Sequence, residues 1–174
     1  MRQDIASRFQ LGNQMRSSIP RLLQIAQQRS GTHVGHKSQR ILSSDYNMVG
    51  VCGEDAFADE FGLKIDDSIK PSGDKGIDFT LSLPFTVDVK TAKLPFNLLL
   101  EVGKPVVDIY VLADYNDSFN KELSSSILLG WEWGKTLAKA PTKDFGYGVI
   151  NHYIPAEDLR PISELKERYE AHIG

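Results

Sequence analysis

The stretch GDKGIDFTLSLPFTVDVKTAK, residues 73–93, decides how the middle of this chain folds. Apolar and polar side chains alternate along its two halves, and Pro84 lies between the halves. The apolar positions are Ile77, Phe79 and Leu81 in the first half and Phe85, Val87 and Val89 in the second. A period of two is typical of a strand with one buried face, and a proline between two such runs marks a turn. The segment therefore predicts an antiparallel β-hairpin.

The polar positions of this hairpin carry three charges. Asp78 lies on the first arm, and Asp88 and Lys90 lie on the second. Side chains two residues apart point to the same side of a strand, so Asp88 and Lys90 share a face. The twist of the hairpin can bring Asp78 to the same end. Two interpretations are open: a solvated sheet face with a cross-strand ion pair, or a chemical centre.

Two carboxylates beside a lysine are a recognisable set for metal-assisted hydrolysis. Mg²⁺ and Mn²⁺ prefer oxygen ligands, which Asp78, Asp88 and the carbonyl of Val89 can supply. A bound ion would polarise a phosphate and lower the pKa of a water molecule. Lys90 would orient or deprotonate that water, or stabilise negative charge in the transition state.

Flanking patterns predict helices on both sides of the hairpin and further strands after it. A serine pair before Ile19-Pro20 and helical spacing predict a helix over residues 18–30. A second helix is expected over residues 45–61, with Gly62 just past its end. The remaining expected elements are strands at 107–113 and 126–133, a short helix at 135–140, an extended segment at 149–154 and a helix after Pro161. Leu98, Leu99 and Leu100 fit either a strand or a helix.

The composition is that of an ordinary globular protein, with 41% hydrophobic and 25% charged residues. Cys52 is the only cysteine, so no internal disulfide can form and a reducing compartment is expected. No run approaches the roughly 20 apolar residues of a membrane helix. The first ten residues also have no apolar core of the kind that a secretory signal needs.

Charge is distributed unevenly along the chain. Residues 1–40 hold seven arginines and lysines against one aspartate, a net charge of +6. Because the whole chain carries −3, the other residues carry −9. We therefore expect a basic N-terminal arm and helix over residues 1–40 and a core domain over residues 41–174. The arm either binds phosphates or packs its arginines against the acidic body.

A known family shares the order of these motifs. A helix with Glu54, then G-I-D at 76–78 and V-D-V-K at 87–90, resembles the PD-(D/E)XK nuclease superfamily. The later pattern, from DIYVLADYN to HYIPAEDLRP, resembles small phage-encoded members. The resemblance implies an α/β fold: a restriction-endonuclease-like mixed β-sheet flanked by helices, with an αβββαβ core and N- and C-terminal helices. Gly76 and Ile77 stand where many members have proline before the first aspartate.

By this resemblance, Asp78, Asp88 and Lys90 match the catalytic motif. Glu54 matches a helical glutamate that some branches place near the metal, so it is a further candidate catalytic residue and metal ligand. It implies a Mg²⁺-dependent endo- or exodeoxyribonuclease that accepts Mn²⁺ and hydrolyses phosphodiester bonds with an activated water. The alternatives are a catalytically inactive nucleic-acid-binding or assembly protein that keeps the nuclease fold, and a structural protein with surface ion pairs.

DNA is the implied partner, and no membrane partner is expected. The candidate DNA-binding residues are Arg21, Arg29, Lys37, Arg40 and Lys93. Symmetric cutting of both strands would favour a homodimer, since one site cuts one strand. The implied location is the cytoplasm of a bacterial or phage-infected cell.

Overall fold

The computed structural model describes residues 21–28, 46–65, 76–81, 85–115, 126–146 and 148–171. The turn expected at Pro84 lies outside these residues, as do Arg29, Lys37 and Arg40 of the basic arm. The domain boundary expected after residue 40 also falls outside them and stays a prediction.

The hairpin forms one side of a four-stranded sheet. Strands β1 (Phe79–Thr80) and β2 (Thr86–Ala92) pair antiparallel, which confirms the predicted hairpin. The sheet continues through β4 (Ile109–Asp114), which is parallel to β2, and β5 (Leu128–Trp133), which is antiparallel to β4. Its order is β1-β2-β4-β5, so the sheet is mixed as expected. All six residues of β4 are buried, in agreement with the continuous apolar run in the sequence.

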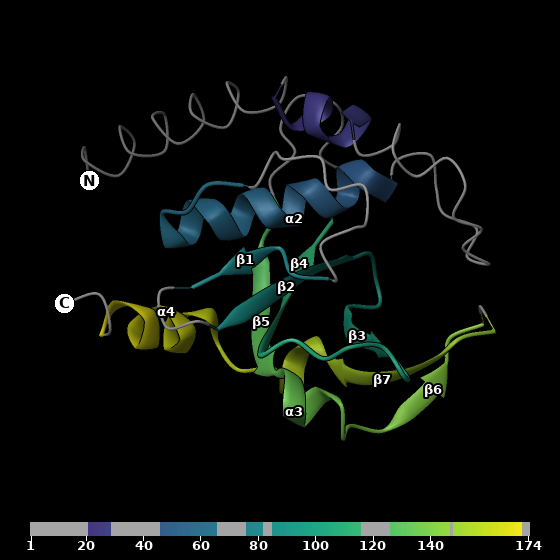
Figure 1. Cartoon of the computed structure of the whole chain (residues 1–174). Coiled ribbons are helices and arrows are strands. Elements are labelled where there is room, and N and C mark those ends of the chain that lie inside the picture. The colour runs from purple at the N-terminus through teal and green to yellow at the C-terminus, as the bar shows by residue number, and fades with distance from the viewer. Residues whose placement is uncertain are drawn as a thin grey trace, which may run out of the picture.

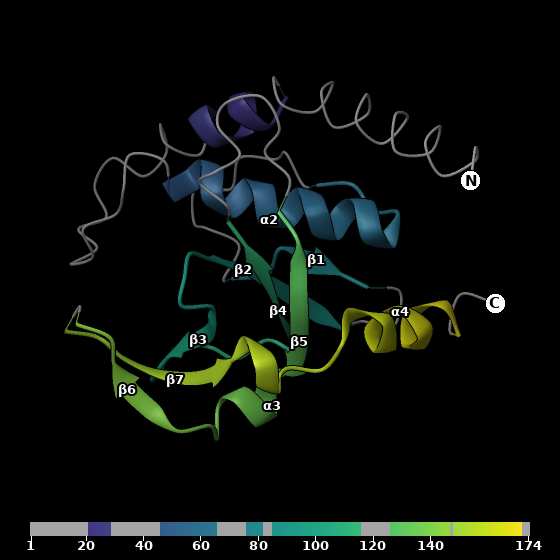
Figure 2. The same cartoon turned by 180° about the vertical axis from the view of Figure 1, so that it is seen from behind.

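Two layers cover the opposite faces of this sheet. Helix α2 (Tyr46–Phe61) packs on β2, β4 and β5 and lies on one side of the sheet in both views (Figures 1 and 2). On that side Val87, Val89 and Trp131 belong to one apolar cluster with Phe57 of the helix. Side chains of the other parity join a second cluster beneath the sheet, formed by Leu98, Leu100, Val107, Tyr110, Leu112 and Leu137. Because successive side chains of a strand point to opposite faces of the sheet, they pack into two separate apolar clusters.

The second cluster is closed by a smaller antiparallel sheet with the strand order β3-β7-β6. Its strands are β3 (Asn97–Glu101), β7 (Ile150–Pro155) and β6 (Thr142–Asp144), and the short helix α3 (Gly134–Leu137) lies beside it (Figure 1). An αβββαβ core would have a helix between the Asp88 strand and the strand parallel to it. The described segment between β2 and β4 contains β3 instead. Leu98 and Leu100 are buried on one face of β3 while β7 pairs along its edge, which favours a strand over a helix.

Local end signals in the sequence place the helices well. Helix α2 is followed by Gly62, whose φ of 63° is in the left-handed region. Leu63 N–H donates to Ala58 O at 2.8 Å and Gly62 N–H to Asp59 O at 3.5 Å, the pattern of a Schellman cap. Residues 21–28 are helical, and a one-turn 3₁₀ helix, η1 (Ala156–Asp158), leads toward α4 (Ile162–Glu170) after Pro161. Among the described helices, none combines the length and the apolar character that crossing a membrane requires.

Candidate metal and nuclease site

Asp78 sits directly before β1 and completes the hydrogen bonding of β2. Its backbone N–H donates to Val87 O at 2.8 Å. Its carboxylate Oδ2 accepts the N–H of Val89 at 2.7 Å. The side chain thus replaces a backbone acceptor at a point where β1 has not yet begun. This contact holds the Asp78 carboxylate at the edge of β2.

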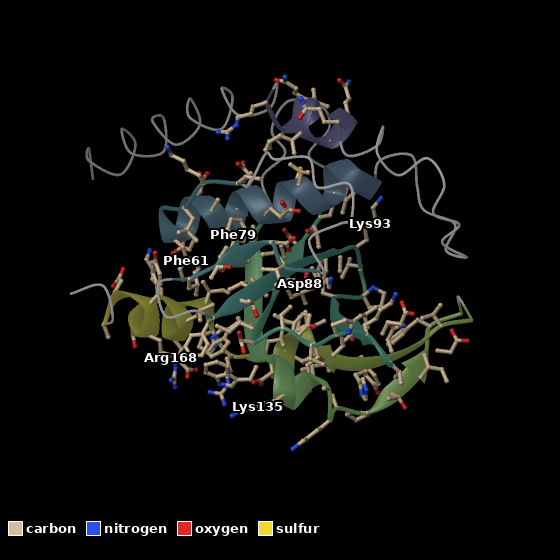
Figure 3. The ribbon with its side chains drawn as sticks, viewed as in Figure 1. Phe61, Phe79, Asp88, Lys93, Lys135 and Arg168 are labelled. Atoms are coloured by element: carbon tan, nitrogen blue, oxygen red, sulfur yellow. The ribbon has the colours of Figure 1, made fainter. Side chains whose placement is uncertain are left out.

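Asp88 and Lys90 lie on one face of β2, as their spacing predicts. Lys90 Nζ is 2.5 Å from Asp88 Oδ2. The Asp88 residue is only 6% exposed and lies near the centre of the molecule (Figure 3), whereas 42% of the Lys90 side chain is exposed. A Cβ on Gly76 would lie 3.4 Å from Asp88 Oδ2, so the G-I-D segment passes close to this carboxylate. The lysine therefore links a buried carboxylate to the surface.

Glu54 is brought to the sheet by a close helix contact. A Cβ added to Gly53 would lie 2.0 Å from Thr91 Oγ1 and 3.2 Å from Ala113 Cβ, so only glycine permits this approach. The neighbouring Glu54 is 6% exposed. Thr91 Oγ1 is the one buried side-chain polar atom of the described residues that has no hydrogen-bond partner. The glycine that weakens the predicted helix thus sets the depth at which Glu54 is buried.

The electrostatics of Asp78 show that negative charges gather here. Burial raises the pKa of Asp78 well above 3.8, and the charges of Glu54 and Asp88 raise it further. The Val89 N–H and Lys90 act in the opposite direction. A carboxyl that is crowded by two others favours either a proton or a cation. The structure thus places three predicted residues, Glu54, Asp88 and Lys90, within electrostatic reach of the fourth.

The donor set fits a hydrated hard cation better than a closed protein cage. The part of the chain that the structure describes contains no group of three His, Cys, Asp or Glu side chains arranged to hold a metal. Mg²⁺ commonly binds one or two carboxylates and retains several waters. Asp78 and Asp88 supply two carboxylates, and the Val89 carbonyl faces the same strand edge as the Val89 N–H. These residues would hold such an ion with water completing its coordination.

Tyr110 is a site neighbour that the sequence reasoning missed. It is paired in register with Asp88, on the adjacent parallel strand. Its hydroxyl accepts the Val107 N–H at 3.3 Å, and burial together with the charge of Asp88 raises its pKa. Tyr110 belongs to the second apolar cluster, on the face of the sheet that also carries Asp88. The sequence did not indicate this role because Tyr110 lies in a run of apolar residues that predicts only a buried strand.

The described candidates for DNA contact differ in their surroundings. Arg21 is exposed, but its helix buries Leu22 and Ile25 in the α2 core. Burial and Asp59 raise the pKa of Asp55 to about 6, and the Arg21 charge opposes this shift. The Arg21 charge therefore acts on Asp55 of α2, and contact of Arg21 with DNA stays a prediction.

Lys93 is exposed at the end of β2 (Figure 3), and its Nζ lies 5.2 Å from the centroid of the Tyr115 ring.

The nuclease resemblance rests on the residues at 54, 76–78 and 87–90. Comparison with protein families, curated proteins and solved structures gives no match to this chain.

Proposed function

We propose that this protein is a Mg²⁺-dependent deoxyribonuclease with a restriction-endonuclease-like fold, in which Mn²⁺ can replace Mg²⁺. The observation that carries the proposal is the meeting of Asp78, Asp88 and Lys90 at the edge of β2. Two crowded carboxylates would attract a cation, and a partly exposed lysine next to them would meet an incoming phosphate.

Each residue has a distinct role in this proposal. Asp78, Asp88 and the Val89 carbonyl would hold the ion, which would polarise the phosphate and acidify a water when bound. Lys90 hydrogen-bonds the attacking water and stabilises charge on the phosphate oxygens. The water oxygen gives up one proton to the surrounding solvent and forms a bond to phosphorus as the bond to the leaving sugar oxygen breaks, and the leaving oxygen takes up a proton from solvent. Glu54 adds negative charge behind Asp78 and strengthens the attraction for the cation.

Cutting both strands symmetrically would require two copies of the site, so a homodimer belongs to this proposal for duplex substrates. A catalytically inactive DNA-binding protein would keep affinity for DNA without cutting it. A purely structural Asp88–Lys90 pair would give neither property.

The test is cleavage of supercoiled, linear and branched DNA with Mg²⁺, Mn²⁺ or EDTA. We expect cutting with either ion and its loss in EDTA, in Asp88→Asn and in Lys90→Met. Asp144→Asn and Lys104→Met are matched controls, since both residues are exposed and lie outside the strands of the four-stranded sheet, and they should keep activity. DNA binding without cutting under every condition would replace the proposal with the inactive alternative.

A further inference from the structure

A second arrangement lies where the parallel strands β2 and β4 end. Ala92 and Asp114 are the last residue pair of these strands. Tyr115 follows, and its N–H donates to Ala92 O at 2.8 Å. Asp114 N–H donates to Ile127 O at 2.9 Å, and Asp114 Oδ1 accepts the Ile127 N–H at 2.5 Å. The backbone that carries Tyr115 is therefore held from both neighbouring strands.

A cation lies over the ring at this position. Lys93 Nζ is 5.2 Å from the ring centroid of Tyr115, within the range of a cation–π contact. Lys93 is exposed and Tyr115 is partly exposed. An aromatic face with a positive charge beside it is the combination that binds a base and its phosphate in single-stranded nucleic acids.

The position is continuous with the candidate site. Lys93 follows Lys90 by three residues, which span roughly 10 Å of an extended strand. Ligands of open α/β sheets bind outside the carboxyl ends of parallel strands, where this pair lies. Helix α2 contacts Thr91 through Gly53. Farther along the helix, the ring of Phe57 packs at a tilt against the ring of Phe79, with 5.0 Å between the ring centroids. Because Phe79 pairs with Val87, the N-terminal half of α2 lies toward the Lys93 end, and its dipole adds positive potential there.

We propose that Lys93 and Tyr115 bind an unpaired DNA strand, with Tyr115 stacking on a base and Lys93 contacting a neighbouring phosphate. In a duplex each base is already stacked and paired, so the ring can engage only an unpaired base. This inference rests on the proposed nuclease function and deepens it: the preferred substrate has a single-stranded segment, such as an overhang or a flap, beside the bond that is cut.

Binding is measured by fluorescence anisotropy of labelled oligonucleotides in EDTA, so that cleavage plays no part. The probes are a single strand, a blunt duplex, a duplex with an overhang and a single strand with abasic positions. We expect Tyr115→Ala to weaken single-strand binding about 5- to 100-fold, with Tyr115→Phe close to the wild type because the ring is kept. Lys93→Met should weaken binding and reduce its dependence on salt.

A matched pair elsewhere on the surface serves as the control. Lys143 Nζ lies 5.4 Å from the centroid of the Phe145 ring on the β6–β7 hairpin. Lys143→Met and Phe145→Ala likewise remove a lysine ammonium and an aromatic ring, and we expect them to leave single-strand affinity unchanged. Circular dichroism establishes that each variant is folded, and Lys93→Met gives a second result should Tyr115→Ala not fold.

Three results would overturn the inference. The first is an unchanged single-strand affinity in Tyr115→Ala, and the second is a loss of affinity in Phe145→Ala as large as that in Tyr115→Ala. The third is that Tyr115→Ala loses as much affinity for the abasic strand as for the intact strand. Failure of the nuclease proposal would give a different combination of binding and cleavage results. If single-strand binding depends on Tyr115 but no DNA is cleaved in Mg²⁺, the catalytic proposal is refuted and the binding site is retained. If DNA is cleaved and the preference for overhangs is the same in wild type and Tyr115→Ala, the nuclease proposal is retained and the binding site is refuted.

Discussion

Two substitutions of Asp78 distinguish the effect of its charge from the effect of its hydrogen bond to the Val89 N–H. Asparagine removes the charge that Glu54 and Asp88 repel, yet its side-chain oxygen can still accept the Val89 N–H. Alanine removes both. Loss of a partner for a buried N–H costs about 1–3 kcal/mol. Without a divalent cation at pH 7, we expect Asp78→Asn to be at least as stable as the wild type and about 1–3 kcal/mol more stable than Asp78→Ala.

A divalent cation should make the wild type more stable than Asp78→Asn. A ligand that binds only the folded state at 100 times its dissociation constant adds about 2.7 kcal/mol of stability. In a chain of this length, each kcal/mol corresponds to about 2–4 °C in Tm. Mg²⁺ should therefore raise the Tm of the wild type by several degrees and that of either variant far less.

The assay is urea unfolding followed by circular dichroism, in EDTA and in a Mg²⁺ series, with thermal melts in parallel. Asp114→Asn is the control, because Asp114 is also a buried carboxylate that accepts a backbone N–H. It should leave the Mg²⁺ effect intact. Equal Mg²⁺ stabilisation of wild type and Asp78→Asn would refute the ligand assignment, and an Asp78→Asn variant as unstable as Asp78→Ala would refute the electrostatic reasoning.

Three further substitutions, one of them with a matched control, test the site and its surroundings. Gly53→Ala should cost about 1–3 kcal/mol in urea unfolding and lower DNA cleavage, because its Cβ would meet Thr91 Oγ1 at 2.0 Å; Gly50→Ala, with nothing within 4 Å, should gain about 0.5–1 kcal/mol, and equal losses in both would contradict the close contact. The folded pKa of Asp55, about 6, lies above its ordinary 3.8, so its contribution to stability is full below pH 3.8 and lost as the pH rises through 6. Asp55→Asn should therefore gain stability relative to wild type between pH 4 and 7, by about 1 kcal/mol once solvent screening of this partly exposed group is included, and a pH-independent difference would count against this. Lys90→Arg keeps the charge but changes its shape, so single-turnover cleavage should fall about 100-fold or more; full activity would mean that only charge matters at this position.

Much of the fold was predictable because its signals are local. Alternation over residues 77–89 sets the hairpin, and the spacing of Asp88 and Lys90 puts both side chains on one face of β2. The glycine after α2 and the proline before α4 mark helix ends through their own backbone preferences. None of these features depends on residues far away in the chain.

The rest needed contacts between distant segments. β3 was ambiguous as a leucine run and became a strand because β7, about fifty residues later, pairs with it. The raised pKa of Asp78 arises from a helix and a strand that meet only in the folded chain. Tyr115 reads as a loop residue until the parallel pairing of β2 and β4 puts it beside Lys93. Local sequence thus specifies which way each side chain points along its element, while long-range pairing, whose energy comes from burial and strand hydrogen bonds, specifies which side chains meet.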